Sequence, residues 1–128
     1  MTIRVVRLGS ARVPGEGARL GTVRYPPRGV AKSEVAARDF YDLWLPLLAP
    51  SAQLIRQARD GAIPWVSFAR RYRAEMAKPE AKQLIALLAH LSHTSDFSVG
   101  CYCADAAQCH RSLLSDLLHA AGAKLAPD

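Results

Sequence analysis

The sequence predicts an α/β domain in which a small, mostly parallel sheet is flanked by helices, a single three-layer-like domain over residues 1–128. Two observations support this. Short β-branched segments come first and segments of helical periodicity follow, and a strand, a turn and a helix come last, over residues 97–122. Ligands of open α/β sheets bind outside the carboxyl ends of strands, so we expect a site in the loops that follow predicted strands.

The first third of the chain is predicted to contribute short strands. Residues 3–8 form a β-branched run bounded by a glycine, and residues 21–25 resemble a second strand that ends at two prolines. The segment between them is rich in glycine and arginine, shows no period and is expected to be a loop. Residues 33–39 could begin a short helix, whereas residues 41–45 favour a strand over a helix.

Three helices are predicted in the middle of the chain. Ser51 can cap a helix that runs to residue 59, and Pro64 and Pro79 are typical first-turn prolines of helices over residues 64–77 and 79–92. Apolar residues recur at helical spacing in the last two segments and are expected to face the core. These residues are Trp65, Phe68, Ala69, Tyr72 and Met76 in the first segment, and Leu84, Ile85, Leu87, Leu88 and Leu91 in the second.

The last strand, turn and helix contain the clearest candidate site. Phe97, Val99, Cys101 and Cys103 alternate with other residues at the period of a strand, and the helix that follows is expected to end at Gly122. The turn places four residues in the first turn of that helix, where free N–H groups and the helix dipole favour an anion. The four candidates are Cys109, His110, Arg111 and Ser112.

Composition limits the class of protein. Half of the 128 residues are apolar, which is enough for one globular core. No run approaches the roughly 20 apolar residues that span a bilayer, and the first residues lack a signal-peptide pattern, so we expect a cytoplasmic protein without membrane contact. Three cysteines within nine residues do not suit a secreted disulfide framework, so these thiols are expected to be buried, reactive or metal-bound.

The distribution of charge favours an acidic partner. The net charge is +6, and the first 28 residues contain six arginines against one glutamate. This suits a small phosphate or carboxylate compound or a nucleic-acid backbone. We prefer the small anionic ligand because the sequence contains no recognisable nucleic-acid-binding motif. The alternative is a nucleic-acid or protein interaction module. Arg24 and Arg28, at a predicted strand end and in the following loop, are candidate ligand-binding residues.

The candidate chemistry centres on Cys109. A thiol at a helix N-terminus near Arg111 is expected to have a lowered pKa, which would make Cys109 a nucleophile or redox thiol, although a buried packing role fits equally well. His110 could act as a general acid or base, or only as a capping or packing residue. Arg111 has a planar guanidinium that fits phosphate or carboxylate, and with Arg28 it would hold one anion if their two loops converge.

A metal site is weighed and not expected. Cys101, Cys103, Cys109 and His110 supply a Cys3His set, but structural zinc ligands are usually spaced by two or more residues. In addition, the adjacent side chains of Cys109 and His110 should diverge on a helix. We therefore predict neither a metal nor a cofactor.

The residues that carry a family resemblance are spread over most of the chain: Arg24, Pro27, Arg28, Gly29, Trp44, Ser51, Cys101, Asp105, Cys109, His110 and Arg111. The chain after Arg19 resembles the DUF488 domains of unknown function, which include the YeaO-like proteins, and the resemblance implies a single α/β domain. Two positions depart from the family pattern: Cys103 stands where Glu is expected, and Ala106 where Pro is expected. If that carboxylate were an acid or base, this chain has lost it or replaced it by a thiol.

Overall fold

The computed structural model describes residues 1–103, 105 and 108–127, so Ala106, one of the two departures from the family pattern, lies outside the described residues. The described residues form one four-stranded sheet with the order β1-β4-β2-β3. Every neighbouring pair is parallel, which confirms the α/β prediction. The strands are β1 (Ile3–Arg7), β2 (Ala18–Gly21), β3 (Leu43–Trp44) and β4 (Phe97–Cys101).

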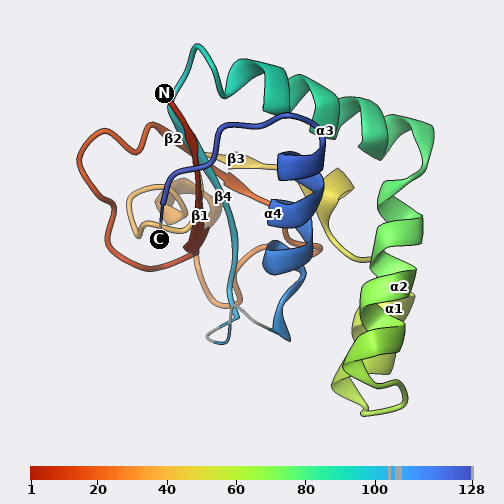
Figure 1. Ribbon diagram of the computed structural model, residues 1–128. Coiled ribbons are helices and arrows are strands. Elements are labelled where there is room, and N and C mark those ends of the chain that lie inside the picture. Colours follow the sequence, from red (N-terminus) through yellow and green to blue (C-terminus); the bar gives the residue numbers. More distant parts are fainter. Residues whose placement is uncertain (104, 106–107, 128) are drawn as a thin grey trace.

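The helices lie to one side of this sheet (Figure 1). Helix α4 lies against β4, and α2 and α3 in turn pack against α4. The long connections that precede β2 and β3 lie on the other side, so irregular segments form the third layer (Figure 1). No helix in the described part of the chain combines the length and apolarity needed to cross a membrane. The elements are η1 (Lys32–Glu34), η2 (Pro46–Leu48), α1 (Ala52–Arg59), α2 (Trp65–Met76), α3 (Pro79–Leu91) and α4 (His110–Ala120).

Local signals place the helices close to where they were predicted. The Ser51 side chain caps α1 by accepting a hydrogen bond from the Leu54 N–H, and Pro79 occupies the first turn of α3. Pro64 lies one position earlier than expected, at the N-cap of α2. Gly122 follows the end of α4 with a φ of 94°, the left-handed conformation that glycine adopts without strain.

The prediction for β2 was wrong. The strand covers Ala18–Gly21, most of which was expected to be loop, and not residues 21–25. The polar appearance of this segment is misleading because Arg19 is only 1% exposed and forms an ion pair with the equally buried Glu16. The polarity of the sequence cannot reveal such a strand, because the Glu16 carboxylate and the segments that cover Arg19 meet it only in the folded protein.

Other expectations hold in part. Residues 33–39 form only the short turn η1 and further turns, whereas β3 lies within the expected 41–45 segment. On α3, Ile85 and Leu88 are buried, but Leu87 is 52% exposed and Leu91 36% exposed, because the helix is covered on one face only. Strand β4 is buried at all five positions because it lies centrally between β1 and β2, so its residues do not alternate between core and solvent.

Candidate functional site

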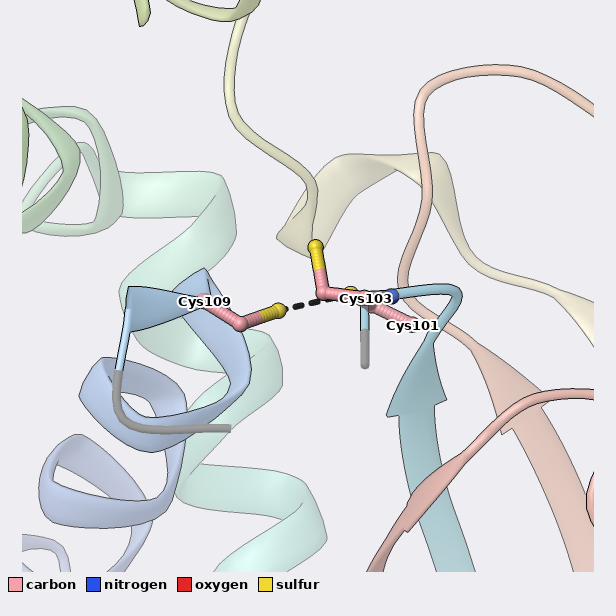
Figure 2. Close-up of side chains that lie close together, drawn as sticks. All are labelled: Cys101, Cys103 and Cys109. Atoms are coloured by element: carbon pink, nitrogen blue, oxygen red, sulfur yellow. Dashed lines mark hydrogen bonds between the residues drawn. The ribbon is translucent and has the colours of Figure 1, made fainter. Parts of the chain in front are cut away.

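Three thiols meet where β4 ends and α4 begins. Cys101 is the last residue of β4, Cys103 follows two residues later, and Cys109 is the N-cap residue of α4. The three sulfur atoms lie within 4.8 Å of one another. The Cys101 and Cys109 sulfurs are 2.7 Å apart and share a hydrogen bond, drawn as the dashed line in Figure 2. We call these three residues the thiol cluster.

The members of the thiol cluster differ in exposure. Cys101 is 3% exposed and Cys109 is 2% exposed, whereas Cys103 is open to solvent. The Cys103 backbone N–H donates to the Cys101 sulfur at 3.3 Å, so the backbone folds around the buried thiol as it leaves the strand. Cys103 is thus the one thiol of the cluster that a molecule from solvent can reach.

The cluster concentrates negative charge on Cys103. The pKa of Cys103 is lowered because the Cys101 and Cys109 thiols donate hydrogen bonds to it, and the positive charge of Arg111 lowers it further against the effect of burial. The pKa of Cys101 is raised by its hydrogen bonds to Cys103 and Cys109 and by burial. The pKa of Cys109 is also raised: a hydrogen bond from Cys101 lowers it, but donation to Cys103 together with burial prevails. The expected lowering of the Cys109 pKa is therefore wrong.

His110 is held in one tautomer beside the cluster. Its Nε2 lies 2.6 Å from the Thr22 carbonyl oxygen, which can only accept, so Nε2 carries the proton and Nδ1 presents a lone pair. Nδ1 lies 3.9 Å from the Cys109 sulfur. Burial lowers the pKa of His110 against the opposing hydrogen bond to Thr22, so the ring is neutral at physiological pH. His110 Nδ1 therefore presents a lone pair towards the Cys109 sulfur.

The thiol cluster opens into a cavity of about 580 Å³, which we call the thiol pocket. Arg24 and Arg28 line it together with the thiols and His110. Arg24 donates from Nε and Nη2 to the carbonyl oxygens of Pro50 and Ala49, so it is held in place, while Arg28 is exposed. The apolar part of the lining is supplied by Ile55, Ile63, Trp65 and Phe68.

Arg111 and Ser112 lie elsewhere. Both line a second cavity of about 700 Å³, together with Arg4 and Arg7 of β1, and this cavity shares no lining residue with the thiol pocket in the described part of the chain. The structure thus brings Arg24, Arg28, Cys109 and His110 together but not Arg111 and Ser112. Arg28 and Arg111 do not face one common cavity, which corrects the expected convergence. Adjacent residues of a helix point about 100° apart, so His110 and Arg111 enter different cavities.

A family model covers nearly the whole chain. The model described as the active DUF488-N3 subclade (DUF488-N3a) matches residues 3–122. The chain belongs to the DUF488 family. This confirms the resemblance drawn from the sequence. No curated protein and no solved structure matches it.

Cys103 is the site residue that sequence reasoning missed. We expected it at the end of the strand, weighed it as a zinc ligand and noted it as a departure from the DUF488 pattern, at the position where Glu is expected, but did not choose it as the reactive thiol. That departure was the available signal, because a residue two positions beyond the end of a buried strand lies where open α/β folds bind ligands. Replacing a carboxylate by a thiol at that position keeps an ionisable group but makes it a strong nucleophile.

The thiol cluster also has the composition of a soft-metal site. Three sulfurs within 4.8 Å of one another could contact a single thiophilic ion. The Cys109 and His110 side chains do not diverge as expected, since Sγ and Nδ1 are 3.9 Å apart. The absence of a metal in this DUF488 protein therefore stays a prediction, to be checked by metal analysis of the purified protein.

Proposed function

We propose that the thiol pocket binds a small, partly apolar molecule bearing an anionic group, and that Cys103 is the nucleophile that attacks it. The observation that carries the proposal is the position of the exposed Cys103, whose sulfur lies within 4.8 Å of two buried thiols on the wall of this cavity. Buried thiols that donate to an exposed sulfur stabilise its thiolate, and the thiolate is the reactive form.

The lining of the pocket supports this class of ligand. A volume of about 580 Å³ lies in the range of small-molecule sites. Trp65 stacks on Phe68 with ring centroids 5.3 Å apart, and this pair offers a flat apolar surface. Arg28, exposed at the rim, supplies a cation for a carboxylate or phosphate group, with Arg24 beside it.

The reaction supported by this arrangement is nucleophilic substitution. Cys103 Sγ forms a bond to an electrophilic atom of the ligand, and the bond from that atom to its leaving group breaks. The leaving group departs with the electron pair and is protonated by solvent. His110 is a positioning residue in this step, because its Nδ1 faces the Cys109 sulfur at 3.9 Å. The description of the matched subclade as active supports a catalytic role for the pocket.

The arginines of the N-terminal third favour this proposal over a nucleic-acid interface. Arg19 is buried and paired with Glu16. Arg12 forms ion pairs with Asp39 and Asp42. These guanidinium groups are engaged within the protein, so much of the charge asymmetry of the sequence serves the fold and not a polyanion.

We also propose a cytoplasmic location. Three cysteines within nine residues do not suit a secreted disulfide framework. Such thiols persist in a reducing compartment and tend to oxidise outside the cell.

Protection of Cys103 from alkylation tests the proposal. Benzoate or phenyl phosphate should slow the reaction of Cys103 with iodoacetamide at neutral pH, because either compound would fill the apolar part of the pocket and pair with Arg28. In the Arg28→Gln protein, the concentration of either compound that gives half-maximal protection should rise by roughly tenfold or more. Arg70→Gln, on the exposed face of α2, should leave this concentration unchanged. Equal reactivity with and without these compounds would contradict the proposed ligand class.

A further inference from the structure

One nitrogen of a buried arginine in the wall of the second cavity lacks a hydrogen-bond partner among the described residues. Arg111 is 6% exposed, and its Nε atom is buried without a hydrogen-bond partner among the residues that the structure describes. Leaving a buried charged donor unpaired is costly, and folded proteins rarely do so without a compensating partner. The missing partner of Arg111 is therefore expected to come from outside the described fold.

The surroundings of Arg111 indicate the chemistry of that partner. Arg111 lies in the first turn of α4, an 11-residue helix whose N-terminus favours an anion. Arg4 and Arg7 line the same cavity, and Asp116 is the acidic residue on the described part of its wall. The cavity therefore has an excess of positive charge.

Hydroxyl groups complete the lining. Ser112 and Ser115 of α4 both border the cavity, and the Ser112 hydroxyl donates to the Cys109 carbonyl oxygen at 2.9 Å. Since the Ser112 proton is used there, the guanidinium groups of Arg111, Arg4 and Arg7 supply the charged donors. Three positive charges on one wall suit a doubly charged phosphate better than a singly charged carboxylate.

We infer that this second cavity binds the phosphate group of a small phosphorylated molecule, with Arg111 as the principal ligand and Arg7 as a supporting one. This phosphate cavity is separate from the thiol pocket and does not depend on the function proposed for it. Its ligand reaches Arg111 from the side of β1 and α4, where Arg4, Arg7 and Ser115 are found.

Calorimetric titration with inorganic phosphate and with phenyl phosphate tests this inference. The protein should bind one equivalent of inorganic phosphate, and the Arg28→Gln protein, whose thiol pocket is weakened, should bind one equivalent of phenyl phosphate in this cavity. Arg111→Met should weaken binding by roughly ten- to hundredfold, because it removes a charge-assisted hydrogen-bond donor. Arg7→Gln changes an exposed residue on β1 and should weaken phosphate binding less. This variant can still be measured if Arg111→Met folds poorly. Arg70→Gln is the matched arginine control.

Thermal unfolding without phosphate separates binding from packing. If Arg111 serves a ligand, the unliganded Arg111→Met protein should melt at the wild-type temperature or higher, because a buried unpaired charge has been removed. Phosphate should then raise the melting temperature of the wild type but not that of the variant. A lower melting temperature for Arg111→Met combined with unchanged phosphate binding would make Arg111 a packing residue and overturn the inference.

Two further comparisons identify the source of the phosphate and separate this site from the thiol pocket. Cys103→Ser should bind phosphate as the wild type does, whatever the outcome of the alkylation experiments. A single-stranded oligonucleotide should bind only when it carries a terminal phosphate. Equal binding of strands with and without that group would indicate backbone recognition and contradict the phosphate cavity. The absence of saturable binding of either small probe would also overturn it.

Discussion

Glu16 and Arg19 show how a single buried ion pair organises the long connection before β2. The Glu16 carboxylate accepts hydrogen bonds from Arg19 Nε at 2.7 Å and from the Ser98 hydroxyl at 2.8 Å. Arg19 Nη1 also donates to the carbonyl oxygens of Ser10 and Asp39. One guanidinium group thus ties three segments to the sheet, and every polar atom in this group of contacts has a partner.

Removing one member of this pair should destabilise the protein strongly. Glu16→Gln is expected to lower the free energy of unfolding by about 3–5 kcal/mol, since it leaves the Arg19 charge buried and uncompensated. Urea unfolding at neutral pH measures this. Glu34→Gln, at an exposed position in η1, is the matched control and should change stability by less than about 0.5 kcal/mol.

The same carboxylate predicts an acid-sensitive stability. Burial raises the pKa of Glu16, but hydrogen bonds from Arg19 and Ser98 prevail and lower it from 4.5 to about 2. Because the folded pKa lies below the unfolded one, this stabilisation is fully present above the unfolded value of 4.5 and is lost as the pH falls through about 2. The wild type should therefore lose stability over this interval, and Glu16→Gln should lose much less. An equal loss of stability with falling pH in the two proteins would show that Glu16 is not the responsible group.

At the scale of single elements, the helix caps are local and were predictable. The Ser51 hydroxyl accepts from the Leu54 N–H and donates to Glu75 of α2 at 2.5 Å, so it both begins α1 and joins it to the next helix. Ser51→Ala should cost about 1–2 kcal/mol in urea unfolding. Ser95→Ala, at an exposed serine, should be close to neutral; if both changes had the same effect, the cap would not be stabilising.

Strand β2 depends on a close approach that the sequence does not reveal. Gly17, just before the strand, has a φ of 78°, and a Cβ atom there would lie 1.9 Å from the Asp96 carbonyl oxygen. Gly15 has nearly the same φ, 76°, but open space around it. Gly15→Ala should cost about 1–2 kcal/mol for its backbone conformation alone, whereas Gly17→Ala should cost at least about 3 kcal/mol because the close contact adds to that strain. Equal losses would show that backbone conformation, and not this contact, sets the start of β2.

These elements show which parts of the fold a sequence reveals. Helices α1, α2 and α3 were predicted because proline, the Ser51 cap and apolar periodicity are signals within a few residues. Strand β2 was missed because the evidence for it lies in Glu16 and in Asp96, which is distant along the chain. Much of the candidate site was predictable for the same reason as the helices, since Cys109 and His110 follow a strand in a local pattern. The separation of Arg28 from Arg111 depended on tertiary geometry.

At the scale of the whole molecule, the first turn of α4 divides two cavities. His110 faces the thiol pocket and Arg111 lines the phosphate cavity, although the two residues are adjacent. The positive charge of Arg111 nonetheless contributes to lowering the pKa of Cys103. Arg111→Met should therefore raise the pH below which the alkylation rate of Cys103 falls, and leave the rate nearly unchanged at neutral and high pH, where the thiolate is formed in both proteins. The same loss of rate at every pH would indicate a change of access and not of charge.

The most direct measurement of the central claim is the rate at which each cysteine is alkylated as a function of pH. All three cysteines fall on one tryptic peptide, between Lys82 and Arg111, so fragment ions must assign the modified residue. We predict that Cys103 reacts first and that its rate is nearly independent of pH between about pH 6 and 8, because its thiolate is already formed. Buried Cys101 and Cys109 should stay unmodified in the folded protein. A Cys103 rate that rises about tenfold per pH unit, as for an ordinary thiol, or earlier modification of Cys109, would contradict the account.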